Sequence, residues 1–131
     1  MNYNEFRTKQ SEDFKAIPIF FAFTKQQLAD GLERFDVTVD DICSMGAGGF
    51  MRKADRHLFD EFFTSQEIEL AKHMGNDEFM VDAIEYELAN HEYCITYDSS
   101  DALGVLGLSL ENDRVKRNFK IARDRFLAGV N

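Results

Sequence analysis

The densest group of side chains capable of chemistry lies between residues 90 and 101. It comprises Asn90, His91, Glu92, Tyr93, Cys94, Tyr97, Asp98 and Asp101. His91, Glu92, Asp98 and Asp101 could ligate a metal ion, but no HExxH pattern and no paired histidine accompanies them. His91 suits the C-terminal end of a helix, and the two aspartates suit a turn and a helix N-cap. We therefore expect structural roles for these residues and no metal or other cofactor.

Cys94 and His91 lie three residues apart and could form a thiol nucleophile with its base. No third group that would orient the histidine and no oxyanion hole is evident, so a hydrolase is the weakest hypothesis. We expect no catalytic residues, and the pattern favours a non-enzymatic protein. Residues 93–97 (YCITY) have strand propensity, and Cys94 is expected to be a buried core thiol. The other cysteine, Cys43, shares no metal-type spacing with Cys94.

The stretch GAGGFMRK (residues 46–53) is the only glycine-rich one. Its backbone N–H groups and two basic side chains could cradle an anion. It matches neither the P-loop nor the dinucleotide-binding fingerprint, and a tight turn is the favoured interpretation. The alternative hypothesis is a small-ligand or nucleotide-binding protein, with a site formed by Gly46, Gly48, Gly49, Arg52, Lys53, His91 and Tyr97.

The net charge of −9 is concentrated in the middle of the chain, where residues 54–111 hold 14 acidic and 2 basic side chains. This charge disfavours direct nucleic-acid binding. It favours a protein partner with a basic surface, although a solvated face that keeps the protein in solution would show the same pattern. The expected partner-binding residues are Asp60, Glu61, Glu67, Glu69, Asp82, Glu85 and Glu87. The basic C-terminal helix is expected to pack on the acidic middle of the same chain.

The elements that position these residues are mostly helical. Apolar periodicity and capping patterns predict about five to six helices. They cover roughly residues 3–15, 24–36, 55–63, 65–74, 77–91 and 110–127, with a further short apolar helical piece at 102–106. Two or three short strands are expected within residues 17–23, 50–53 and 93–97. Capping boxes at Thr24 and Thr64 predict helix starts, Asp77 is the predicted N-cap of the central helix, and Gly31 marks a close contact. The predicted fold is helix-dominated α+β.

The 131 residues suit one compact domain, residues 1–131, with a core of its own. The polar start is unlike a signal peptide, and no apolar run approaches a membrane span. A cytoplasmic protein without membrane contact is expected, and the oligomeric state is left open.

Three stretches together carry a resemblance: IPIFFAFTKQQLADGL, GAGGFMRKAD and YELANHEYCITYDSSDALGVLGL. They resemble a family of small, uncharacterised acidic proteins carried by bacteriophages and conjugative elements of bacteria. The resemblance covers much of residues 17–108 and transfers no functional residues. It implies a protein that binds host or rival machinery. The first hypothesis is therefore an interaction protein, such as an inhibitor of a nucleic-acid-handling host or defence complex.

Overall fold

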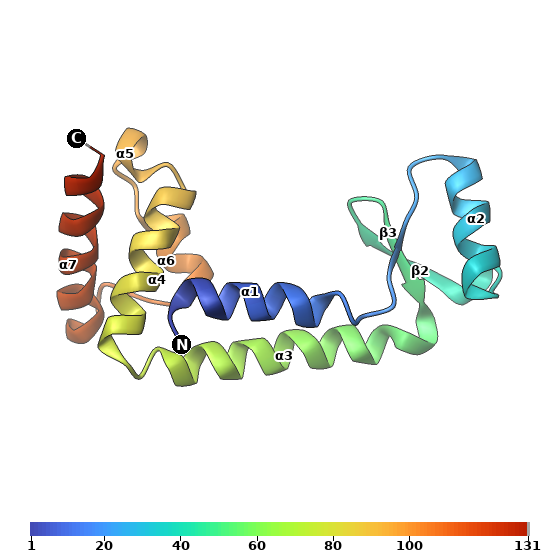
Figure 1. Cartoon of the computed structure of the whole chain (residues 1–131), viewed down its shortest axis with the longest axis horizontal. Helices are drawn as coiled ribbons and strands as arrows, with labels where there is room; N and C mark the ends of the chain where they lie inside the picture. Colours follow the sequence, from blue (N-terminus) through green and yellow to red (C-terminus); the bar gives the residue numbers. More distant parts are fainter. Residues whose placement is uncertain (131) are drawn as a thin grey trace. The chain divides into compact units, whose positions relative to one another are not determined.

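The structure is a computed structural model that describes residues 1–130 (Figure 1). The described residues form seven α-helices, two 3-10 turns and three short strands, so the helix-dominated α+β prediction is confirmed, with more helices than expected. The elements in chain order are α1 (Tyr3–Phe14), β1 (Phe20–Phe21), α2 (Lys25–Phe35), η1 (Val39–Asp41), β2 (Ile42–Gly46), β3 (Gly49–Arg52), η2 (Lys53–Asp55), α3 (Arg56–His73), α4 (Asp77–Asn90), α5 (Tyr93–Thr96), α6 (Ser100–Leu106) and α7 (Asp113–Gly129).

The chain divides into two compact units, and the divisions fall inside α1 and α3. Unit 1 comprises Met1–Lys9 and Glu67–Asn131, and unit 2 comprises Gln10–Gln66. Each unit has its own core, described separately below. That both belong to one domain stays a prediction.

The core of unit 1 is built around α4. Met80, Ala83, Ile84 and Leu88 recur at helical spacing and are almost completely buried, as predicted. They pack against α7, which lies beside α4 in Figure 1, and against α6. From these two helices come Val115, Phe119 and Ala122, and Ala102, Leu103 and Leu106. The N-cap of α4 is Asn76, one residue before the predicted Asp77, because Asn76 Oδ1 accepts a hydrogen bond from the Phe79 N–H at 3.0 Å.

Unit 2 contains a three-stranded antiparallel sheet in the order β1-β3-β2. Phe20 on β1 lies opposite Phe50 on β3, and its ring also contacts Phe35 of α2. Thr24 caps α2 as predicted, accepting a hydrogen bond from the Gln27 N–H at 3.1 Å. The close contact expected at Gly31 is confirmed, since a Cβ there would collide with the Phe20 ring.

Two predicted elements are wrong. Residues 93–96 form the single helical turn α5 rather than a strand, because Tyr93 is buried against Phe119 and Phe126 of α7. This packing outweighs the strand propensity of the residues. The break expected near Thr64 does not occur either. No glycine or proline lies between Arg56 and His73, so the hydrogen-bond ladder of α3 continues through the apparent capping box.

Across residues 1–130, none of the helices is both long and apolar enough to span a membrane.

Candidate functional site

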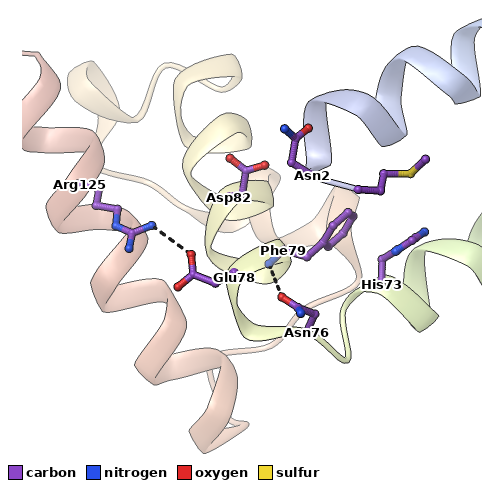
Figure 2. Close-up of a pocket in the computed structure, with 8 residues that line it drawn as sticks. Asn2, His73, Asn76, Glu78, Phe79, Asp82 and Arg125 are labelled. Carbon is purple, nitrogen blue, oxygen red and sulfur yellow. Dashed lines mark hydrogen bonds and ion pairs between the residues drawn. The ribbon is translucent and has the colours of Figure 1, made fainter.

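A polar pocket of about 420 Å³ lies in unit 1, where the first residues of the chain meet α4 and α7 (Figure 2). Its wall combines two carboxylates, an arginine, a histidine and an aromatic ring. The lining residues are Met1, Asn2, His73, Asn76, Glu78, Phe79, Asp82 and Arg125. Of these, only Asp82 was among the predicted site residues.

The two carboxylates come from α4. Glu78 and Asp82 are four residues apart, so they lie one above the other on the same face of the helix. The backbone N–H of Tyr3 donates to Asp82 Oδ2 at 2.8 Å and fixes that carboxylate. Glu78 is open to solvent and lies 3.9 Å from the Arg125 guanidinium of α7, a loose ion pair. The pocket therefore contains one carboxylate held by a hydrogen bond and one exposed carboxylate in a long ion pair.

The aromatic part of the wall is formed by His73 and Phe79. Their rings are nearly parallel, with centroids 5.0 Å apart and an interplanar angle of 23°. Phe6 meets both rings edge-on at 5.6 Å and 6.0 Å. These contacts fix the orientation of the His73 ring, which lies at the C-terminal end of α3.

Elsewhere on the contact between α1 and α4, Glu87 is the centre of a buried polar network. It is 2% exposed, so its assignment to the acidic surface is wrong. Its carboxylate accepts hydrogen bonds from the Tyr3 hydroxyl at 2.7 Å and from Arg7 at 3.2 Å. Asn90 donates to the other oxygen at 3.3 Å, and His91 Nε2 lies 3.3 Å from that same oxygen. Burial and the hydrogen bond to Glu87 raise the pKa of Tyr3 well above its ordinary value of 10.0.

The remaining acidic candidates divide between α3 and α4. Asp60, Glu61 and Glu67 are exposed on α3, and within residues 1–130 none of the three forms an ion pair. Glu69 lies 3.5 Å from Lys72 on the same helix. On α4, Asp82 and Glu85 are half-buried.

The glycine-rich stretch forms the turn between β2 and β3. Gly46 and Gly48 have φ of +84° and +79°, a region that favours glycine. A side chain at position 48 would also collide with the ring of Phe23, so the turn interpretation accounts for the glycines. Arg52 lies 2.6 Å from Asp55, and its charge is therefore already paired. Lys53 is exposed.

The other residues proposed for that ligand site, His91 and Tyr97, belong to unit 1, whereas the glycine turn belongs to unit 2. His91 caps α4, as expected for a histidine at a helix C-terminus. Its Nε2 is buried 3.3 Å from a Glu87 carboxylate oxygen, but within residues 1–130 it forms no hydrogen bond.

The expectation that Cys94 is a buried core thiol is wrong. Because residues 93–96 are helical, the inward position is taken by Tyr93, and Cys94 is exposed. Asp98 has the predicted turn role, because its carboxylate accepts from the Ser100 N–H at 2.9 Å, which lowers its pKa. The described part of the chain contains no cluster of three or more His, Cys, Asp or Glu side chains that could hold a metal ion.

Two arginines of the basic helix α7 pair within the chain, as predicted. Arg114 lies 2.6 Å from Asp77 and also donates to the Met74 carbonyl at 2.6 Å. Arg125 forms the loose pair with Glu78 described above. Both contacts join α7 to the first turn of α4.

Comparison with known protein families adds one finding. The chain belongs to a family of unknown function (DUF7659), whose pattern matches residues 2–125. Neither the curated proteins nor the solved structures contain a match.

Proposed function

We propose that this chain is a protein-interaction module that binds a partner with a basic surface. The observation that carries the proposal is the set of exposed carboxylates on α3, namely Asp60, Glu61 and Glu67, for which residues 1–130 provide no ion-pair partner. Asp60 and Glu61 lie in the part of α3 that belongs to unit 2, and Glu67 lies in the part that belongs to unit 1. Charges without a partner in the fold are available to a partner of opposite charge.

Electrostatic complementarity of this kind acts mainly on association. Opposite charges on two surfaces steer the encounter and exclude partners of the wrong sign, and the effect weakens as salt screens the charges. The acidic net charge of −9 extends this field beyond α3. Binding should therefore be fast and sensitive to salt.

The partner we propose is a nucleic-acid-handling complex of a bacterial host or of its defence system. Proteins that bind nucleic acid carry basic patches that neutralise phosphates, so an acidic protein can occupy the same patch and compete with the nucleic acid. The resemblance to small proteins of bacteriophages and conjugative elements supports a mobile-element origin for such an inhibitor. A cytoplasmic location follows from this proposal.

The test is affinity capture from bacterial lysate, followed by measurement of Kd with the purified partner. The variant Asp60→Lys/Glu61→Lys/Glu67→Lys should weaken binding by about tenfold or more at low salt. A matched control, Glu33→Lys/Asp40→Lys/Glu111→Lys, makes the same change in net charge at other exposed positions and should bind nearly as well as the native chain.

Equal loss in both variants would show that only total charge matters, and unchanged binding in the α3 variant would contradict the proposal. For the finer proposal, the purified partner should release a bound DNA or RNA oligonucleotide when the protein is added. Continued binding of the oligonucleotide would exclude competition.

A further inference from the structure

We propose that the pocket in unit 1 binds the guanidinium group of an arginine side chain from the basic partner. The inference rests on the proposed function and extends it, because it names the chemical group that enters the molecule. The argument depends on three features of the pocket: its carboxylates, its ring wall and its volume.

The carboxylates match the hydrogen-bonding pattern of a guanidinium group. Asp82 Oδ2 is occupied by the Tyr3 N–H, while within residues 1–130 no hydrogen bond to Asp82 Oδ1 is formed. Glu78 follows one turn away, and its 3.9 Å separation from Arg125 is too long for a strong pair. A guanidinium has five N–H donors in one plane and can address two carboxylates at once.

The ring wall favours arginine over lysine. The planar, weakly hydrated guanidinium group of arginine stacks on an aromatic face. The ammonium group of lysine is strongly hydrated, so it gains less binding free energy from the same contact. Phe79 is 4% exposed and is stacked on His73, so the ring available to an incoming planar cation is that of His73, which Phe79 and Phe6 hold in place. The wall is therefore preorganised, and little side-chain freedom is lost on binding.

The volume suits one side chain rather than a large cofactor. About 420 Å³ lies at the small end of the range for ligand pockets, roughly 300–1,000 Å³. The two carboxylates of the lining also disfavour a free anion, and Arg125 is the one guanidinium among the lining residues. Arg125, which also lines the pocket, can donate a hydrogen bond to the peptide carbonyl that accompanies an arginine residue of the partner.

The experiment uses the full chain and a small probe. N-acetyl-arginine amide is titrated into 15N-labelled protein, and the backbone amide shifts of Phe79 and Asp82 are followed. N-acetyl-citrulline amide, which has nearly the same shape without the charge, serves as the ligand control. N-acetyl-lysine amide tests the preference for a planar cation. We expect saturable shifts with the arginine probe, weaker ones with lysine and none with citrulline.

The variant Glu78→Gln/Asp82→Asn keeps the size of both side chains and removes their charge. It should raise the Kd for the arginine probe about tenfold. Glu85→Gln makes the same kind of change on α4 outside the pocket and should leave that Kd unchanged. Circular dichroism checks that both variants are folded.

Equal binding of citrulline, or unchanged binding in the double variant, would overturn the inference. The two proposals fail separately. If partner capture depends on the α3 carboxylates but the arginine probe causes no shift, the pocket is not an arginine site and the proposed interaction module still stands. If the arginine probe binds saturably but charge reversal on α3 does not change partner capture, the pocket proposal stands and the proposed role of α3 is wrong.

Discussion

In unit 1, sixteen of the described residues form one buried core around α4, whereas in unit 2 the corresponding cluster has three fully buried members, Phe20, Ala22 and Ile42. The five side chains packed against that smaller cluster are only partly buried. Unit 2 compensates with close ring contacts, such as Phe20 stacked on Phe50 at 5.7 Å. We infer that the stability of unit 1 depends mainly on the amount of buried apolar surface. The stability of unit 2 depends mainly on the close fit of a few aromatic rings.

The largest effect is expected from Leu88→Ala in unit 1. Leu88 is 0% exposed near the C-terminal end of α4, so its truncation removes buried apolar surface and leaves a cavity. The free energy of unfolding should fall by about 2–5 kcal/mol in urea denaturation followed by circular dichroism. A loss under about 1 kcal/mol would show that this core collapses around the cavity and is less rigid than the comparison implies.

Next comes Tyr3→Phe, which tests whether a polar network adds to the stability of unit 1. The substitution removes the hydroxyl donor to the buried Glu87 carboxylate and should cost about 1.5–3 kcal/mol at pH 7. The pKa of Tyr3 is raised in the folded protein, so its contribution is complete below pH 10 and is lost as pH rises further. The gap between the native chain and the variant should therefore narrow above pH 10. A constant gap would exclude Tyr3 as the titrating group.

In unit 2, Gly31→Ala should cost about 1–3 kcal/mol, because the added methyl group meets the buried Phe20 ring. The matched control is Gly104→Ala, in the interior of α6, where nothing lies within 4 Å of the new Cβ. That control should be neutral or stabilising by up to about 1 kcal/mol. Thermal denaturation measures both variants. If they had the same effect on stability, close packing around the Phe20 ring would not determine the stability of unit 2.

The smallest effect is expected from Asp77→Asn at the exposed start of α4. The Asn118 amide and then the Arg114 guanidinium lower the pKa of Asp77 below its ordinary value of 3.8. Its contribution is present above that value and is lost as pH falls. The native chain and the variant should thus converge in stability below about pH 4.

Asp113→Asn provides the control for that measurement, because Asp113 also begins a helix, α7. It reports the helix-dipole effect without the contacts to Asn118 and Arg114. If the stability of both variants depends on pH in the same way, the effect of Asp77 comes from its position at the helix start and not from its contacts with Asn118 and Arg114.

The sequence predicted those elements whose signals are local. The stripe Met80, Ala83, Ile84 and Leu88 and the cap at Thr24 depend on residues a few positions apart, and both are confirmed. Residues 93–96 were misassigned because the burial of Tyr93 against α7 is a contact between distant segments. Propensity does not contain that information.

The same limit applies to the site. Glu87 was placed on the surface by its charge, yet it lies three residues after Ile84 and so falls on the buried stripe. That spacing was the available signal. No comparable signal existed for the pocket, since His73, Asp82 and Arg125 come from three different helices and only the fold brings them together. Of its residues, sequence reasoning identified Asp82 alone, through the acidic character of α4.

The exposed thiol of Cys94 offers a practical handle for these experiments. Cys43 is half-buried, so a maleimide dye at limiting concentration should react first at Cys94, without any introduced cysteine. Position 94 lies outside both the α3 carboxylates and the residues that line the pocket. A fluorophore there can report partner binding through its tumbling rate while leaving both proposed contact sites unmodified. The same thiol requires a reducing agent during storage, because two molecules could otherwise join through a disulfide and mimic a dimer.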